Sequence, residues 1–239
     1  MKIKKPLVSV IIAVYNDIRY FPFSIDSILK QSYKNFEVLI VDDFSNNETR
    51  EMLKIYCEKY PKIIKYIRSN RNLGDGERAR NLAIPKARGK YIAVLDSDDI
   101  AYPNRLEKQV DFLERNNDVF LVGTQADTID ENGVSIGQRV LPLDPGSIRR
   151  IMYRKNAIIN PSVMFRNEKK NSFYKIRFPI FNDYYTYACL ISKGKKLCNL
   201  PDKLIKYRVS RSSATFSKVK YKFLINMDIK KALVQDFGY

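Results

Sequence analysis

The 239-residue sequence has no histidine, no tryptophan and only three cysteines. The absence of histidine excludes a Ser-His or Cys-His dyad and a His-ligated zinc ion. A general base in this chain must therefore be a carboxylate, a lysine, a tyrosine or a cysteine. Cys57, Cys189 and Cys198 lack the paired spacing of a zinc site or a disulfide framework, which indicates free thiols in a reducing cytosol.

Long apolar runs are also missing. Residues 7–14 form an apolar run behind Lys2, Lys4 and Lys5, an arrangement that imitates a signal peptide. The run is short, however, and no small-residue cleavage site follows it. No segment approaches the ~20 apolar residues of a membrane-spanning helix, so we expect a cytoplasmic protein.

Positive charge is what the chain has in excess, with 43 Lys and Arg against 26 Asp and Glu and a net charge of +17. This balance indicates an anionic partner: nucleic acid, an anionic membrane surface or a phosphorylated small molecule. No helix-turn-helix, RNP-like or zinc motif is present, so we expect no nucleic acid. Residues 216–239 mix apolar residues with lysines, which predicts a basic amphipathic helix. This helix either packs on the domain edge or contacts anionic lipid at the inner membrane face.

The order of the apolar segments predicts the fold class. In residues 1–117, segments typical of strands alternate with segments typical of helices, which predicts βαβ units with right-handed crossovers. We therefore expect an α/β fold with a Rossmann-like, mostly parallel central sheet flanked by helices. The alternation fails after about residue 117, and residues 118–215 are predicted to form a mixed α+β half of the same domain. The expected strands are 7–15, 36–41, 63–67, 91–95, 119–129, 134–141, 158–165 and 204–209, and the expected helices are 18–31, 46–60, 76–87, 105–116, 144–154 and 182–192.

One of the expected strands ends abruptly at Asp96, Asp98 and Asp99. Ionised carboxylates this close repel one another, and burying one without a partner is costly. Asp96 and Asp98 are two positions apart and face the same side of a strand, while Asp99 follows in the turn. Oxygen ligands favour Mg²⁺, Mn²⁺ or Ca²⁺ over zinc or copper. The motif predicts a divalent-cation site, with a solvated acidic turn that caps the next helix as the alternative.

Five short motifs follow one another in the first half of the chain. They are SVIIAVYN at 9–16, VDDFS at 41–45, NLG at 72–74, ARN at 79–81 and LDSDD at 95–99. In this order they resemble the nucleotide-sugar-binding half of glycosyltransferase family 2, which has the GT-A fold. The resemblance is strong over residues 7–109 and continues weakly at 160–165, 182–183 and 207–208.

The resemblance implies one GT-A-like catalytic domain over residues 1–215, followed by the helix at 216–239. Residues 1–117 are the implied nucleotide-sugar-binding half, and residues 118–215 the acceptor-side half. The implied activity is that of an inverting, metal-dependent glycosyltransferase that uses Mn²⁺ or Mg²⁺ and a UDP, GDP or dTDP type of donor. The expected acceptor is a saccharide or a lipid-linked molecule, as in polysaccharide or glycolipid biosynthesis.

Donor contacts are expected where the strands of the parallel sheet end, because ligands of such sheets bind there. Asp43 can accept a hydrogen bond from a base N–H or a ribose hydroxyl, and the resemblance implies a nucleobase contact. Tyr15 is expected to present its ring to the base, beside backbone groups of Ala13. The alternative for Asp42 and Asp43 is an N-cap of the following helix.

The resemblance assigns further roles around the acidic motif. Asp96, beside Ser97, is implied to contact the ribose or the sugar. Asp98 and Asp99 are implied to hold the metal ion, and the sequence does not choose the principal ligand between them. Arg80 is expected to hold the donor phosphates or to order the acidic turn, with Arg78 as its competitor.

The acceptor side needs a base, because an attacking hydroxyl must lose its proton. Asp183 resembles the family's base position at the start of a helix, and an Asp that merely caps this helix is the alternative. Many relatives have Glu where this chain has Asn182. They often have His where this chain has Asn160 and Ser210.

Arg208 and Arg211 are the candidates to replace the charge of the second missing histidine. Because these histidines are absent, a non-catalytic nucleotide-sugar or polyanion-binding module is the alternative function. A sugar-nucleotide pyrophosphorylase would need a Gly-rich, Arg-containing loop after the first strand, and the chain has Tyr15-Asn16-Asp17 there.

Overall fold

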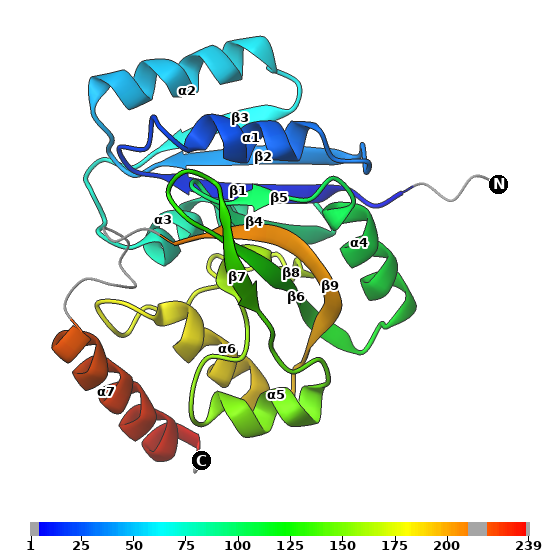
Figure 1. The fold of residues 1–239 in the computed structure, drawn as a ribbon, viewed down its shortest axis with the longest axis vertical. Helices are drawn as coiled ribbons and strands as arrows, with labels where there is room; N and C mark the ends of the chain where they lie inside the picture. The colour runs from blue at the N-terminus through cyan, green and yellow to red at the C-terminus, as the bar shows by residue number, and fades with distance from the viewer. Residues whose placement is uncertain (1–4, 210–218, 238–239) are drawn as a thin grey trace.

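The computed structural model describes residues 5–209 and 219–237 of the chain (Figure 1). In these residues, nine strands form one sheet in the order β3-β2-β1-β4-β8-β6-β9-β5, and β7 pairs with β6. The first four strands are mutually parallel: β1 (Val8–Val14), β2 (Phe36–Asp42), β3 (Ile64–Arg68) and β4 (Tyr91–Asp96). Their carboxyl ends therefore meet at one edge, as the alternating pattern predicts.

The second half of the sheet has mixed strand directions. β8 is antiparallel to both β4 and β6, whereas β9 is parallel to β6 and antiparallel to β5. The strands of this half are β5 (Ile100–Ala101), β6 (Val119–Ile129), β7 (Ser135–Arg139), β8 (Met164–Arg166) and β9 (Lys196–Arg208). The predicted change from a parallel to a mixed sheet is confirmed.

Helices cover both faces of the sheet and create two apolar cores. One core contains α1 (Phe21–Leu29), α2 (Asn47–Lys59) and α4 (Arg105–Arg115). The other contains α3 (Gly76–Ala83), α5 (Pro145–Met152), α6 (Asn182–Ser192) and α7 (Val219–Phe237). In Figure 1, α1 and α2 lie at the opposite end of the molecule from α5, α6 and α7.

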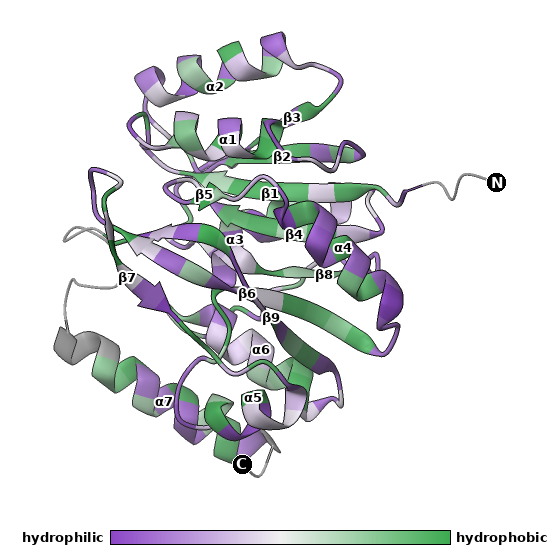
Figure 2. Ribbon diagram, turned by 45° about the vertical axis from the view of Figure 1, so that its right-hand side comes forward, coloured by the Kyte–Doolittle hydropathy of each residue, from purple (hydrophilic) through white to green (hydrophobic). Residues whose placement is uncertain are grey.

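Strand β1 explains why both faces are covered. Val10 and Ile12 belong to the first core, and Ile11 between them belongs to the second, all with no exposed surface. Alternate residues of a strand point to opposite faces, so an unbroken apolar run needs helices on both sides. Figure 2 shows β1 as almost continuously hydrophobic, whereas α2 alternates between hydrophobic and hydrophilic residues.

Two predicted strands differ from the structure. The expected strand at 158–165 is mostly absent, because Asn160–Ser162 form the short 3₁₀ helix η2 and strand pairing begins only with β8 at Met164. Pro161 has no N–H to give to a ladder and fits the first turn of a helix. Strand β9 begins at Lys196 rather than at 204, because its pairing with β6 continues through a register shift past Pro201 and Asp202.

Two of the predicted helices are shorter than expected by four residues or more. The helix expected at 18–31 spans Phe21–Leu29, and the one expected at 76–87 ends as an α-helix at Ala83. The chain then continues as the 3₁₀ helix η1 (Ile84–Lys86), because Pro85 cannot occupy the interior of an α-helix.

Helix α7 packs against the core rather than standing free. Its inward residues Ile225, Ile229, Ala232 and Leu233 are buried in the core that also contains α6. Its outward face exposes large apolar side chains: Phe223, Leu224, Met227 and Val234. The predicted start of this helix at 216, together with Ser210 and Arg211, lies outside the described residues.

Candidate active site

A pocket opens where β1, β2 and β4 end. It is a cavity of about 570 Å³ that collects most of the residues predicted to bind a donor. Its walls include Ala13, Tyr15, Asp43, Arg80, Asp96, Ser97 and Asp98. We call this cavity the strand-end pocket. Parallel strand direction brings together three of the sequence motifs, and helix α3 adds Arg80 from a fourth.

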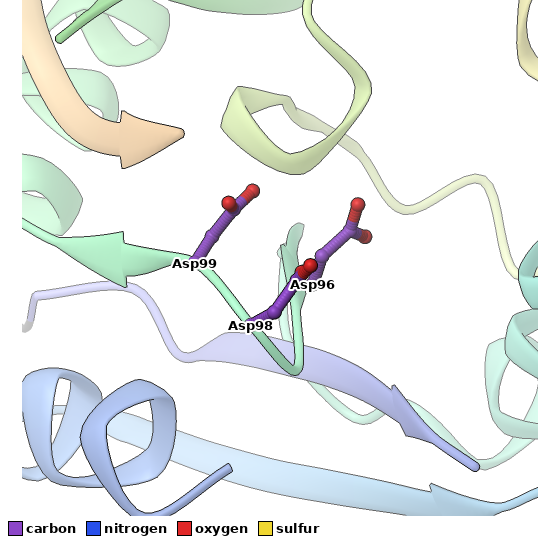
Figure 3. Close-up of side chains that lie close together, drawn as sticks. All are labelled: Asp96, Asp98 and Asp99. Atoms are coloured by element: carbon purple, nitrogen blue, oxygen red, sulfur yellow. The ribbon is translucent and has the colours of Figure 1, made fainter. Parts of the chain in front are cut away.

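The acidic turn between β4 and β5 lies at one wall of this pocket, and Figure 3 shows the side chains of its three aspartates. Asp96, Asp98 and Asp99 each offer a carboxylate oxygen, and these oxygens lie within 4.8 Å of one another. Asp99 is only 1% exposed; its Oδ1 accepts the backbone N–H of Arg208 at 2.7 Å, and its Oδ2 is buried without a hydrogen-bond partner. A buried orphan oxygen within an oxygen-only cluster fits a hard divalent cation such as Mg²⁺ or Mn²⁺.

Electrostatics supports the same interpretation. Burial, together with the charges of Asp96 and Asp17, raises the pKa of Asp98 to about 7. Burial and the charge of Asp98 also raise the pKa of Asp99 well above its usual value. Carboxylates held in this way are stable as anions only when positive charge is near.

Arg80 lies on the inner side of helix α3. It is 5% exposed and forms ion pairs with Asp96 and, at 3.5 Å, with Glu77. Arg78, its competitor in the sequence analysis, pairs with Asp75 at 3.8 Å and lines neither of the two pockets at this edge. The structure therefore brings Arg80, and not Arg78, to the acidic turn.

Asp43 organises the loop before α3. Its carboxylate accepts the backbone N–H of Leu73 at 2.9 Å and the hydroxyl of Ser69 at 3.3 Å. Neither Asp42 nor Asp43 caps α2, because the side chain of Asn46 fills that role. Asp43 thus lies on the pocket wall with its backbone and its loop already fixed.

A second pocket of about 400 Å³ adjoins the first and shares Gly74, Asp75, Gly76 and Asp96 with it. We call it the Asp183 pocket. Asp183 is in the first turn of α6, and its Oδ2 accepts a hydrogen bond from Asn156 Nδ2 at 2.9 Å. Burial raises the pKa of Asp183 to about 6. Such a group is ionised at neutral pH yet basic enough to accept a proton.

Asn182 has a structural role beside this aspartate. It has no exposed surface, its Nδ2 donates to Asp75 Oδ2 at 2.7 Å, and its Oδ1 accepts the backbone N–H groups of Arg177 and Phe178. It therefore ties the start of α3 to the start of α6. The residue before it, Phe181, has a left-handed backbone with φ of 63°, which is strained for a bulky side chain.

Asn160 also makes contacts that an imidazole could not reproduce. Its carbonyl oxygen accepts the hydroxyls of Tyr174 at 2.9 Å and Tyr187 at 2.5 Å, while its Nδ2 donates to Glu77 at 3.2 Å. Histidine has no oxygen that accepts two such bonds. Asn160, which stands where many relatives have His, is thus part of a polar network on the wall of the Asp183 pocket.

Arg208 supports the acidic turn from the end of β9. Its Nε donates to the backbone oxygen of Asp98 at 2.8 Å, and its guanidinium lies 4.4 Å from the centre of the Tyr20 ring. Arg208 is 5% exposed. Its positive charge partly opposes the rise that burial causes in the pKa of Asp98 and of Asp99, although it forms no ion pair with them. Arg211, the other candidate, is outside the described residues.

Three residues that were not predicted from the sequence also line these pockets: Asp17, Asp75 and Glu77. Asp17 directly follows the first motif, and a carboxylate at a strand end is a feature from which it could have been predicted. Asp75 and Glu77 lie in a polar stretch whose contacts to α6 and η2 come from the tertiary fold. No local pattern identifies them.

Comparison with known proteins decides the family. Residues 9–182 match the family model Glycosyl transferase family 2. The chain belongs to glycosyl transferase family 2. It is 38% identical over 221 residues to the uncharacterized glycosyltransferase MJ1057 of Methanocaldococcus jannaschii, covering 90% of this chain and 75% of that one.

Two solved structures share the fold of this family 2 member. S. aureus TarS 1-349 in complex with UDP-GlcNAc has a TM-score of 0.74 at 22% identity, covering 97% of this chain and 67% of that one. The mannosyltransferase PcManGT from Pyrobaculum calidifontis, in complex with GDP-Man and Mn²⁺, has a TM-score of 0.64 at 18% identity, covering 94% of this chain and 61% of that one. At these identities the likeness shows the fold alone.

The predictions of a glycosyltransferase and of a GT-A-like fold are confirmed at the level of the family and the architecture. Nothing in the comparisons supports the non-catalytic module. Within residues 5–209 and 219–237, no helix combines the length and the apolar character needed to span a bilayer.

Proposed function

We propose that this family 2 member is an inverting, metal-dependent transferase that moves a sugar from a nucleoside diphosphate to an acceptor hydroxyl by direct displacement. One observation carries the proposal. The acidic turn on the wall of the strand-end pocket and Asp183 in the adjoining pocket are joined through Asp96, which lines both cavities. A donor in the first pocket and an acceptor in the second would therefore meet at Asp96.

The residues of the strand-end pocket suit a nucleoside diphosphate sugar. Tyr15 is 53% exposed and lines this pocket with Asp43 and Ala13, so its ring would be available to a base. Asp96 and Ser97 would contact the ribose or the sugar. The UDP-GlcNAc and GDP-Man bound by TarS and PcManGT support a donor of the UDP, GDP or dTDP type.

Asp98 and Asp99 would hold the Mn²⁺ or Mg²⁺ ion. A bound divalent cation supplies positive charge that offsets the charge growing on the leaving diphosphate. Arg80 would add a second positive charge, because its ion pair with Asp96 fixes its guanidinium at the acidic turn. Because the leaving group is stabilised in this way, the reaction needs no acid to protonate it.

Asp183 would act as the single base. Its carboxylate is oriented by Asn156, and its neighbour Asn182 fixes the start of α6 against α3. One positioned carboxylate that removes the hydroxyl proton contributes typically about 10²–10⁴-fold to the rate. A single base on the acceptor side is what a one-step displacement with inversion requires.

The acceptor would be a saccharide or a lipid-linked molecule. The Asp183 pocket combines amides that suit hydroxyl groups, Asn156 and Asn160, with the apolar walls of Ile180 and Phe181. For a lipid-linked acceptor, the exposed apolar face of α7 would contact an anionic membrane from the cytoplasmic side. Co-sedimentation with phosphatidylglycerol vesicles, and not with phosphatidylcholine vesicles, is the expected result; equal recovery with both would contradict this contact.

Replacement of Asp98 tests the proposal directly. Nucleotide release from UDP-, GDP- and dTDP-sugars is measured with Mn²⁺ for the wild type, Asp98→Asn and the control Asp118→Asn. Asp118 is an exposed carboxylate paired with Lys196 before β6, and it lines neither pocket. We expect turnover to be lost in Asp98→Asn alone. Full turnover in this variant, or turnover that survives chelation of the metal, would show that the site is misassigned.

A further inference from the structure

The loop between β1 and α1 brings a fourth carboxylate to the acidic turn. Asp17 lines the strand-end pocket together with Asp96 and Asp98. The Ser97 hydroxyl donates to Asp17 Oδ2 at 2.6 Å, and the backbone N–H of Tyr20 donates to Asp17 Oδ1 at 2.9 Å. Both oxygens are thus fixed by protein donors, and the group is held in place at the pocket.

We propose that Asp17 is a positioning residue of the cation site, which strengthens cation binding through its charge and through Ser97 rather than as a direct ligand. The inference rests on the proposed metal dependence. Asp17 is not among the carboxylates whose oxygens lie within 4.8 Å of one another, which is the reason for assigning it to an outer position.

The charge balance of the turn supports this role. Among the ion pairs of the described residues, Asp96 pairs with Arg80, whereas Asp17, Asp98 and Asp99 take part in none. Asp17 lines the same pocket as Asp98, so the negative charges of both carboxylates act on this point. A divalent cation bound there would be attracted by both groups, whereas without a cation the like charges repel each other.

Two hydrogen bonds join the β1–α1 region to the acidic turn. The Ser97 hydroxyl donates to Asp17 in the loop, and the Ser24 hydroxyl at the start of α1 donates to the backbone oxygen of Asp96 at 2.9 Å. Outer groups that fix the direct ligands in this manner affect metal affinity by about 10–100-fold. The β1–α1 loop is therefore part of the cation site and not only a connection.

A plainer role for Asp17 is to begin the turn that leads into α1, through its bond to Tyr20 N–H. Asp17→Asn separates the two roles, because the amide oxygen can keep the turn bond from Tyr20 N–H while the amide NH₂ donates to Ser97 Oγ, which reverses that second bond. The negative charge is removed and the turn is kept. Asp26→Asn is the matched control, since Asp26 lies on α1 and faces Tyr56 of α2 instead of the pocket.

Mn²⁺ binding is measured by electron paramagnetic resonance, with the ion alone and with Mn²⁺ plus UDP, and thermal stability is recorded without metal. We expect Asp17→Asn to bind Mn²⁺ about tenfold or more weakly, and to be at least as stable as the wild type without metal. Asp26→Asn should bind as the wild type does. Ser97→Ala should show a smaller loss than Asp17→Asn, because the charge remains.

The outcomes separate the inference from the proposed function. If the wild type binds Mn²⁺ and Asp17→Asn binds it within twofold as well, the role of Asp17 is refuted while the metal site stands. If Asp17→Asn melts lower without metal and binds Mn²⁺ normally, the plainer turn role is correct. If the wild type binds no Mn²⁺ with or without UDP, the metal dependence and this inference both fail.

Discussion

The two halves of the sheet hold their site residues by different means. In the first half, parallel strands that are apolar on both faces fix the pocket, and the functional side chains follow directly at the strand ends. In the second half, strand directions are mixed; Asp183 accepts a hydrogen bond from the Asn156 amide, and its neighbour Asn182 donates to Asp75 at the start of α3. The pocket proposed for the donor is therefore shaped by the apolar core, and the pocket proposed for the acceptor by a polar network.

Asp183→Asn is the variant with the largest expected effect on the acceptor half. The turnover number for transfer should fall by about 10²–10⁴-fold, because the proton of the attacking hydroxyl is no longer accepted. Donor affinity should stay unchanged, since the strand-end pocket does not include this residue. Steady-state kinetics with varied donor concentration measures both quantities. Asp144→Asn, which alters the exposed cap of α5, is the control, and equal losses in the two variants would refute the assignment.

Ile12→Ala tests the claim that the donor half depends on its apolar core. Ile12 has no exposed surface, so the truncation should lower the free energy of unfolding by about 2–5 kcal/mol. Ile136→Ala in β7, where the side chain is 57% exposed, should change it by less than about 0.5 kcal/mol. Urea denaturation compares the two. Similar losses would remove the distinction between core and surface on which the comparison depends.

Asn182→Ala makes the corresponding test in the acceptor half. The change removes the partner of two partly buried backbone N–H groups and of Asp75 Oδ2, at a cost of about 1–3 kcal/mol in unfolding free energy. Turnover should fall while donor affinity is kept, because the start of α6 is released from α3. The exposed turn residue Asn132 offers a control in Asn132→Ala. A variant with wild-type stability and turnover would mean that the polar network does not hold the base.

The pH dependence of Asp183 is the smallest of these effects. Its pKa of about 6 predicts that transfer falls as the pH is lowered through 6, because the protonated acid cannot accept a proton. The stability effect has the opposite sign. A carboxyl whose pKa is raised from 3.8 to about 6 on folding destabilises the fold as it ionises. Asp183→Asn should thus become more stable than the wild type as the pH rises from 4 to 6. Denaturant titrations at several pH values measure this difference in unfolding free energy. A difference that does not change with pH would contradict the assigned pKa.

The same contrast explains what can be predicted from the sequence. The strands of the first half are located within one or two residues. For β1, β2 and β4 the signal is a mostly apolar run that ends near Asp or Asn, which is typical of a strand buried on both faces. The acidic turn and Asp43 follow from their place at the strand ends. Asp183 comes from the family resemblance, and its role remains a prediction.

Other features depend on contacts that no local pattern contains. The early start of β9 is hidden because Pro201 and Asp202 interrupt its apolar pattern, while pairing with β6 continues on both sides of them. The network of Asn160 with Tyr174 and Tyr187 joins residues up to 27 positions apart. The sequence alone does not show which partner a polar side chain has in the folded protein.

Nucleotide-induced stabilisation is the most direct test of the central claim that the carboxylates after β4 bind a cation that in turn binds a diphosphate. Melting of the full chain is recorded with UDP, GDP and dTDP, each with Mn²⁺ or with EDTA. One of these nucleotides should stabilise the fold only when Mn²⁺ is present, by about 2.7 kcal/mol at a concentration of 100 times its Kd, and Asp98→Asn should abolish the effect. Equal stabilisation in EDTA, or no stabilisation by any of the three nucleotides, would contradict the account.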